Sequence, residues 1–524
     1  MPDPSPSPAR RTRRGPVLAA LVLAMFMAAI EGTIVATAMP SIAGSLGGFA
    51  LYGWVFASYL LMQAATTPMF GKLADLFGRK SVFTLGVAVF LAGSVACGFA
   101  TSMPWLIAFR FVQGAGAGAV QPVTNTLAGD LFAFRERARV QGWLASVWGF
   151  SAILGPLAGG LIVEHAHWAW IFWANVPFGL LALGLVATYL HEDVRRTERR
   201  IDHAGAVTFF VGIAALITVL TQFGTFPAWL SLALLALSTT SLSFFAWHET
   251  RAPDAMMPPD LWRDRLVTTA NLGTLGAGIV MIAVISYLPT YAQGVLGTSA
   301  LVAGFTLTTM SMGWPLAAVV AGRLMVRVGV RTTVRAGGIA LVLGATGFAL
   351  LDRVREAWFA AAASAIIGVG MGLLITTFLV SVQTRVSWHR RGAATATNAL
   401  MRILGNALGA ALLGGVVNAS LTSFLRREGL AGQVSLDDVT RLLTERAAAD
   451  PALLERVSTG LAQGLDRAFL VMLVFAVITL AICLAMPDLR PEETRGRPTE
   501  TSGPRPPENG GDRGPDANQN RRPN

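Results

Sequence analysis

The chain has 524 residues, of which 53% are hydrophobic and only 14% are charged. Its apolar residues recur in stretches long enough to cross a bilayer, so the sequence predicts a polytopic, all-α membrane protein rather than a soluble one. A formal net charge of +11 would suggest nucleic-acid binding in a soluble protein, but here the basic residues alternate with the apolar stretches and therefore indicate membrane topology.

In chain order, the hydropathy predicts about fourteen membrane spans. They lie near residues 17–39, 52–70, 81–101, 104–127, 141–163, 169–190, 204–222, 227–247, 268–291, 303–325, 334–351, 357–380, 394–418 and 467–486. The first could be a signal peptide, since Arg10, Arg11, Arg13 and Arg14 precede an apolar run. The length of that run and the many spans behind it argue against cleavage.

Lysine and arginine fall before the first span and in every second connection after it, as at residues 72–80 and 135–139. The intervening connections 40–51 and 100–104 carry neither. The positive-inside rule then places both termini in the cytoplasm of a multi-pass protein of the plasma (inner) membrane.

Three segments read as polar. Residues 1–14 and 490–524 are rich in Pro, Arg and Gly and are predicted to be disordered cytoplasmic tails. The outer loop 419–466 contains one or two short amphipathic helices, which we interpret as a solvated cap over the outer mouth rather than a binding domain.

An internal repeat divides the chain. Residues 71–80 (GKLADLFGRK) align with residues 322–331 (GRLMVRVGVR) at an offset of 251 residues. Each copy follows the second span of a six-span unit if the spans between 204 and 247 are an insertion. The sequence therefore predicts two six-helix lobes, 15–192 and 251–489, joined by two extra helices and a linker at 193–250, with a transport site between the lobes.

Glu31 is the only acid inside its span, where an ionisable group costs a few kcal/mol or more unless it faces a cavity, pairs or takes up a proton. Arg110 lies about 9 Å along the fourth span from the outer side and Glu31 about 12 Å along the first, at 1.5 Å per helical residue. The matching depths predict that the two communicate, directly or through water, and couple to a proton. The alternative is that Arg110 snorkels outward.

We interpret the first repeat copy as a cytoplasmic latch, a loop that holds one lobe against the other reversibly. Gly71 and Gly78 permit a tight turn and close helix approach, while Asp75 and Arg79, at i and i+4, can pair or engage a neighbouring helix end. An ordinary positive-inside loop is the alternative. Val326 replaces Asp75 in the second copy, so the latch is expected to be asymmetric.

Further candidates lie within the fifth and thirteenth spans. Gly155 and Gly159 flank Pro156, a pattern that bends a helix and lets a partner approach closely. Arg402 lies midway between Asn398 and Asn406 on one helix face and, like these and Gln113, is a candidate to line the cavity. The alternatives are snorkelling for Arg402 and simple interhelical hydrogen bonds for the amides. Glu164, His165 and His167 resemble a metal cluster, but they fall at the outer end of the fifth span and no further ligand follows at convincing spacing, so no metal site is predicted.

Several of these motifs resemble those of the major facilitator superfamily, within it the fourteen-span drug:proton antiporters. The similar segments are GKLADLFGRK (71–80), RFVQGAGAGAVQP (110–122), AIEGTIVATAMP (29–40), GPLAGG (155–160), WAWIFWANVPFG (168–179) and YLPTYAQGVLGTSALVAG (287–304). The first-span motif more often carries Asp where this chain has Glu31. The resemblance implies the major facilitator fold, and the GPLAGG motif implies export rather than uptake.

The predicted function is proton-coupled antiport that exports lipophilic, cationic or neutral drugs by alternating access. Its partners would be small lipophilic substrates, protons and the bilayer, with no cofactor, nucleic acid or ATP, and the carrier would be a monomer. The alternative is a proton-coupled carrier for one defined metabolite, lipid or peptide. A membrane enzyme is not expected, because the sequence has no HExxH, no GxSxG with plausible partners and no Walker loop; a receptor would be indicated only by signalling without flux.

Overall fold

The computed structural model describes residues 12–46, 51–192, 202–221, 226–252, 255, 257, 259–298, 300–429 and 451–487. The predicted tail 490–524, most of the tail 1–14 and the centre of the outer loop 419–466 lie outside these residues. Within the described residues all the regular elements are helices, as the all-α prediction requires.

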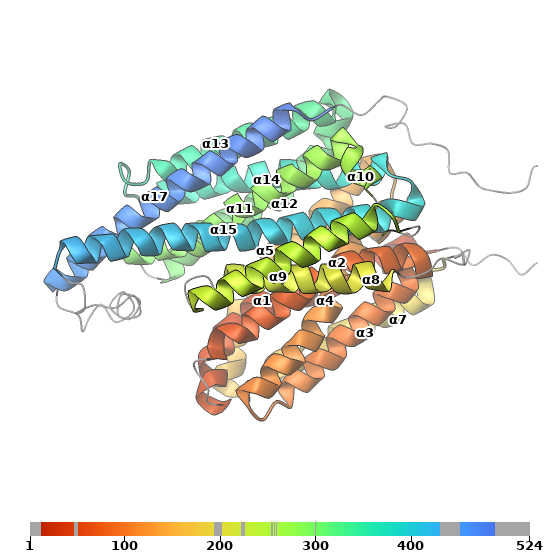
Figure 1. Ribbon diagram of the computed structural model, residues 1–524, viewed down its shortest axis with the longest axis horizontal. Helices are drawn as coiled ribbons and strands as arrows, with labels where there is room; N and C mark the ends of the chain where they lie inside the picture. The colour runs from red at the N-terminus through yellow and green to blue at the C-terminus, as the bar shows by residue number, and fades with distance from the viewer. Residues whose placement is uncertain are drawn as a thin grey trace, which may run out of the picture.

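The first half of the chain forms an N lobe (Figure 1). Its helices are α1 (Arg14–Leu46), α2 (Tyr52–Phe77), α3 (Arg79–Gly98), α4 (Met103–Leu131), α5 (Phe134–His165), α6 (Trp170–Trp173) and α7 (Asn175–Tyr189). In this lobe α1 packs on α5 and α7, and α4 packs on α2 and α3.

The second half forms a C lobe of similar design. Its elements are α10 (Asp260–Arg263), α11 (Arg265–Gly294), α12 (Ala300–Val328), α13 (Val330–Ala349), α14 (Ala357–Arg385), the 3-10 turn η2 (Trp388–Arg390), α15 (Arg391–Arg427) and α17 (Pro451–Leu484). Here α14 packs on α12 and α13, and α11 packs on α15 and α17. Between the lobes in sequence, α8 (His203–Thr221) and α9 (Ala228–Glu249) form a hairpin, and α8 contacts both α2 and α15.

The lobes meet along two helix pairs, α2 with α15 and α5 with α12. In Figure 1 α15 lies beside α2 toward the right and diverges from α1 and α3 toward the left, where it meets α17. We call the right-hand end, where α2 ends and α15 begins, the basic end, because it carries Arg79, Arg139, Arg323 and Arg391. This is the end that the positive-inside rule assigns to the cytoplasm.

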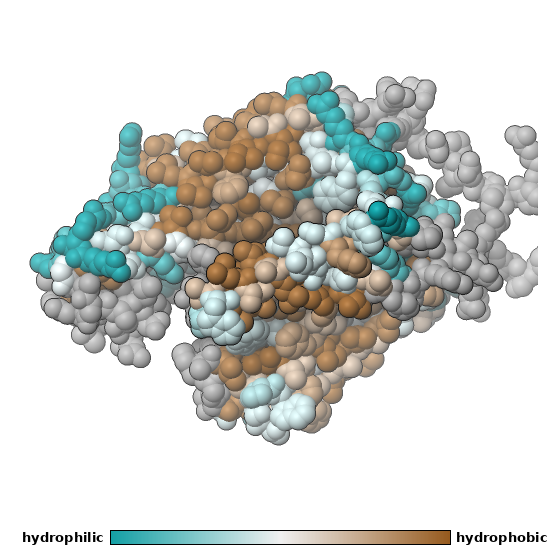
Figure 2. Space-filling view, viewed as in Figure 1, coloured by the Kyte–Doolittle hydropathy of each residue, from teal (hydrophilic) through white to brown (hydrophobic). Residues whose placement is uncertain are grey.

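The surface is that of a membrane protein. Ten helices among the described residues are long and apolar enough to cross a bilayer. Large apolar side chains such as Leu157, Leu343 and Val474 are more than half exposed, at 59%, 59% and 56%. Figure 2 shows hydrophobic residues across the middle of the bundle and hydrophilic ones at its ends. The number of fourteen crossings stays a prediction.

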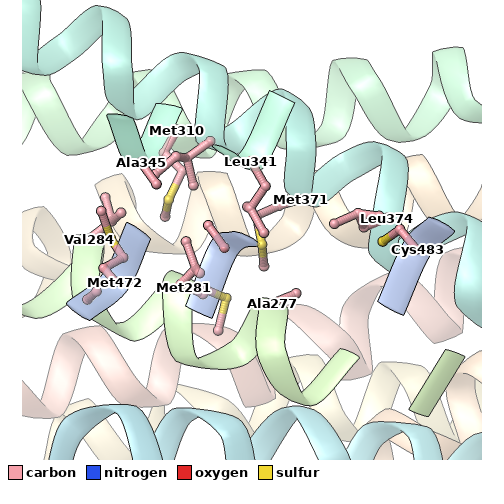
Figure 3. Packing of buried hydrophobic residues seen from close by; sticks show 14 of the residues in the cluster. Ala277, Met281, Val284, Met310, Leu341, Ala345, Met371, Leu374, Met472 and Cys483 are labelled. Atoms are coloured by element: carbon pink, nitrogen blue, oxygen red, sulfur yellow. The ribbon is translucent and has the colours of Figure 1, made fainter. Parts of the chain in front are cut away.

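Each lobe has a core of its own. In the C lobe, Met281, Met310, Leu341, Met371 and Met472 come from five different helices and fill the space between them (Figure 3). A smaller cluster joins α2, α8 and α15 across the lobes. Because most apolar burial lies within the lobes, they can move relative to one another without exposing either core.

The two repeat copies have the same backbone turn. Gly78, between α2 and α3, has φ 88°, and Gly329, between α12 and α13, has φ 86°. Glycine adopts this left-handed region without the strain that a Cβ would cause. The alignment of the two segments therefore corresponds to a real structural equivalence.

Candidate functional site

The Glu31 carboxylate is completely buried in α1 and both of its oxygens are bonded. Arg110 of α4 donates from Nη1 to Oε1 at 2.5 Å, and Asn175 of α7 donates from Nδ2 to Oε2 at 2.7 Å. The structure thus brings Glu31 and Arg110 into direct contact, and Arg110, itself 1% exposed, does not snorkel.

A second layer of polar side chains holds this pair. Gln113 Oε1 accepts from Arg110 Nη1 at 2.8 Å, and Gln113 Nε2 donates to Ser94 Oγ at 3.1 Å. Ser94 also accepts from Asn175 Nδ2 at 3.1 Å and donates to the Phe172 carbonyl at 2.8 Å. Gln113, a predicted cavity residue, therefore serves the Glu31 network, which links α1, α3, α4 and α7.

Arg110 has further partners on α2. Its Nε donates to the Val55 carbonyl at 3.1 Å, and its guanidinium lies 4.3 Å from the centre of the Tyr59 ring. The buried Tyr59 hydroxyl has no hydrogen-bond partner among the described residues. Arg110 can consequently stay bonded when Glu31 changes its charge, because a carbonyl, an amide and an aromatic face remain available.

Opposing influences act on the ionisation of Glu31. Complete burial penalises the charged carboxylate, whereas the Arg110 cation and the Asn175 amide favour it. A small change in the surroundings can therefore change the protonation state. This arrangement is suited to taking up and releasing a proton as helices shift.

The GPLAGG glycines lie against α1 close to Glu31. A Cβ on Gly155 would be 1.9 Å from Thr33 Oγ1, and one on Gly159 would be 3.0 Å from the Ile34 carbonyl. Thr33 also donates to the Ser151 carbonyl at 2.9 Å. These contacts seat α1 directly on α5. Pro156 lies in α5 between the two glycines, and its side chain is outside the described part.

At the basic end, Asp75 of α2 joins the two lobes. Its Oδ1 accepts from Arg79 Nη2 at 2.7 Å and from the Gly392 amide at 2.9 Å, and its Oδ2 accepts from the Ala393 amide at 2.8 Å. Asp75 thus pairs with Arg79 and also binds the amino end of α15, where backbone N–H groups and the helix dipole favour an anion. Gly71 permits this approach, since a Cβ there would be 2.3 Å from Ala396 Cβ.

Arg79 extends the contact between the lobes. It donates from Nε to Asp130 Oδ2 at 3.0 Å and from Nη2 to the Trp388 carbonyl at 2.8 Å, and its guanidinium lies 3.8 Å from the centre of the Trp388 ring. Asp130 of α4 also pairs with Arg391 of the C lobe. We call Asp75, Arg79, Asp130, Trp388 and Arg391 the latch cluster.

Asn398 and Arg402, which the sequence places on one face of α15, lie in two different environments. Asn398 is buried inside the C lobe, where it donates to Asn271 at 3.1 Å and to Thr274 at 2.9 Å. Arg402 instead faces the N lobe, with its guanidinium 5.8 Å from the centre of the Trp148 ring. Among the described residues Arg402 forms no ion pair, and the Oδ1 atom of Asn406 has no hydrogen-bond partner.

The sequence did not predict several residues of the Glu31 network and of the latch cluster. Asn175 and Ser94 complete the Glu31 network, while Asp130, Trp388 and Arg391 complete the latch cluster. Asn175 stands in the motif WAWIFWANVPFG, and an amide deep in an apolar run is a signal that could have found it. The described residues contain no group of three or more His, Cys, Asp or Glu placed to hold a metal ion.

Two helical lobes with separate cores, an apolar exterior and a buried ion pair define a membrane transporter rather than an enzyme. The sequence model of the Major Facilitator Superfamily matches residues 21–410, and this chain belongs to that superfamily. Its members move small substrates across membranes, commonly as monomers.

Relatives and solved structures agree with this assignment. The chain is 34% identical over 413 residues to the multidrug transporter protein MdtP of Bacillus subtilis (strain 168), covering 78% of this chain and 76% of that protein. It is 30% identical over 491 residues to multidrug resistance protein 3 of the same organism, covering 91% and 96%. Among solved structures, its fold resembles the human organic anion transporter MFSD10 (TM-score 0.60, 14% identity, 91% of this chain and 100% of that one). It also resembles the proton:xylose symporter XylE (TM-score 0.57, 12% identity, 90% and 96%).

Proposed function

We propose that this chain is a proton-coupled antiporter that exports lipophilic, cationic or neutral compounds across the plasma membrane. The observation that carries the proposal is the buried Glu31 carboxylate, bonded to Arg110 and Asn175 and surrounded by helices that must move during transport. The names of the two Bacillus subtilis relatives, a multidrug transporter and a multidrug resistance protein, support a drug as the exported compound.

The lobes would alternate between two arrangements. In the present one the latch cluster ties them together at the basic end, which we assign to the cytoplasm, so the site between them is closed to the cytoplasm. Protonation of Glu31 from outside removes its charge and weakens its bonds to Arg110 and Asn175. The helices α1, α4 and α7 can then shift, and the inward proton gradient biases the population of states toward substrate release outside.

Arg402 bears on the choice of substrate. It is a cation at the lobe interface, about 16 Å along α15 from its start at 1.5 Å per residue, and it forms no ion pair among the described residues. A permanently cationic substrate would be repelled there, whereas a neutral compound with a carbonyl or ether oxygen could accept a hydrogen bond. We therefore propose that neutral lipophilic compounds are the better substrates.

Everted membrane vesicles test the proposal. Accumulation of a fluorescent lipophilic compound, driven by an imposed pH gradient, is compared in the natural chain, Glu31→Gln and the control Glu164→Gln, whose carboxylate is exposed at the end of α5. We expect gradient-driven accumulation in the natural chain and the control and none in Glu31→Gln at equal expression.

Equal accumulation in Glu31→Gln would refute Glu31 as the coupling residue. No accumulation in any of the three, across a panel of unrelated lipophilic compounds, would refute drug export and favour a carrier for one defined metabolite, lipid or peptide.

A further inference from the structure

The second repeat copy adjoins a cavity that the transport mechanism does not use. This cavity of about 380 Å³ lies at the basic end, between α5 of the N lobe and α12 of the C lobe. Its lining residues are Arg139, Val319, Gly322, Arg323, Val326 and Arg327. The volume is within the range of sites that hold small molecules, about 300–1,000 Å³.

The charge of the cavity is wholly positive. Arg139 comes from one lobe and Arg323 and Arg327 from the other, and none of the lining residues is acidic. Among the described residues none of the three arginines forms an ion pair; the guanidinium of Arg139, an exposed residue, lies 5.6 Å from the centre of the Trp143 ring. Arg323 and Arg327 are four residues apart on one helix face, where like charges repel. An anion in the cavity would offset all three charges at once.

The first repeat copy shows what such an anion does. There the Asp75 carboxylate lies between the lobes and binds Arg79 and the amino end of α15. Val326 occupies the aligned position in the second copy and lines the cavity instead. In the second copy Arg323 aligns with Lys72, Arg327 aligns with Leu76, and Val330 stands where the first copy has Arg79, so this copy places its own arginines between the lobes and lacks the acid.

The cavity also borders apolar surface. A Cβ on Gly142 of α5 would be 2.6 Å from Val319 Cγ2, so the two helices touch about one turn from Arg139 and bound the cavity toward the membrane interior. Beside it, Trp143, Val320 and Leu316 are 47%, 43% and 67% exposed. A ligand with an anionic head and apolar chains matches both surfaces, as expected for a basic pocket between helices at the cytoplasmic face of a membrane.

We propose that this cavity binds the phosphate of an anionic phospholipid headgroup, which supplies between α5 and α12 the negative charge that Asp75 supplies between α2 and α15. The phosphate oxygens accept hydrogen bonds from arginines of both lobes, and the acyl chains lie along α5 and α12. Bound lipid thereby stabilises the arrangement in which the basic end is closed. This inference is independent of proton coupling and of substrate identity.

Thermal unfolding of the purified full chain in detergent tests the proposal. The protein is titrated with short-chain phosphatidylglycerol, with phosphatidylcholine of the same chain length and with inorganic phosphate. We expect phosphatidylglycerol to raise the unfolding midpoint by about 2 °C or more, and the other two to leave it unchanged. An equal rise with phosphatidylcholine would overturn the proposal, and an equal rise with inorganic phosphate would show that the ligand is a soluble phosphate compound instead.

Two variants place the effect in the cavity. The double substitution Arg323→Gln and Arg327→Gln should abolish the rise, whereas Arg265→Gln, which removes an exposed arginine at the start of α11, should retain it. Val326→Asp would place a carboxylate in the cavity, so its midpoint without lipid should exceed that of the natural chain and should no longer respond to phosphatidylglycerol. A full response to phosphatidylglycerol in both cavity variants would refute this site.

Discussion

The Asp75 carboxylate of the N lobe accepts a hydrogen bond from the Gly392 amide at the amino end of α15, at 2.9 Å. It is therefore a helix cap supplied by the other lobe. Charge-assisted bonds of this kind are strong enough to favour one arrangement, about 1.5–3 kcal/mol each, and can be broken without exposing an apolar core.

The first prediction concerns this cap. Asp75→Asn removes the charge that binds Arg79 and the Gly392 and Ala393 amides, so the basic end should open more often. A reporter cysteine at the buried Thr395 should then react with a water-soluble maleimide about ten times faster, since 1.4 kcal/mol is a tenfold change in population. Asp352→Asn, an exposed acid outside the latch cluster, is the control. Unchanged labelling in Asp75→Asn would show that the cap does not hold the lobes together.

The second prediction concerns Asn175. Its amide donates to Glu31 and so favours the ionised carboxylate; removing it by Asn175→Ala should let Glu31 bind a proton at higher pH. The pH midpoint of gradient-driven transport should therefore move upward. Asn398→Ala, which removes a buried amide from the C lobe, should leave the midpoint in place. A midpoint shift in the opposite direction would contradict the role assigned to Asn175.

The third prediction compares two glycines of the same motif. A Cβ at Gly155 would collide with Thr33 Oγ1, whereas one at Gly160 has nothing within 4 Å. Gly155→Ala should destabilise the protein by about 1–3 kcal/mol and reduce transport by displacing α1 from α5. Gly160→Ala should be neutral. Thermal unfolding and transport at matched expression measure both effects, and equal behaviour of the two variants would show that α1 is not seated by Gly155.

The fourth prediction concerns Arg402. Replacing this cation by Arg402→Gln should increase export of a permanently cationic dye relative to a neutral one, because the repulsion at the lobe interface is removed. The ratio of the two export rates in everted vesicles is the measurement. Arg353→Gln, exposed between α13 and α14, serves as the control. An unchanged ratio would exclude Arg402 as a selector of substrate charge.

Much of the Glu31 site could be predicted from the sequence, because a helix that crosses the membrane fixes the depth of each of its residues. Counting helical residues put Glu31 and Arg110 at matching depths, and the structure joins them. Depth does not determine which way a helix faces, and for this reason Asn398 and Arg402, four residues apart on α15, could not be assigned to different surroundings in advance.

The latch was only partly predictable for a different reason. Asp75 near the end of α2 and Arg79 at the start of α3 are only four residues apart, on either side of the Gly78 turn, so their pairing could be expected from the local sequence. Their C-lobe partners, the Trp388 carbonyl for Arg79 and the Gly392 and Ala393 amides for Asp75, are more than 300 residues away, and no local pattern indicates which lobe surfaces meet. The α-helical class and the repeat, by contrast, follow from hydropathy and from glycine spacing, both of which are local.

The α8 and α9 hairpin touches both lobes, since α8 packs against α2 and against α15. Those two helices belong to different lobes, and they separate whenever the basic end opens. The contact of α8 with α2 is the more extensive, so the hairpin should travel with the N lobe and slide over α15. In each transport cycle the insertion would thus act as a movable side wall, shielding the parting lobes from lipid along one flank.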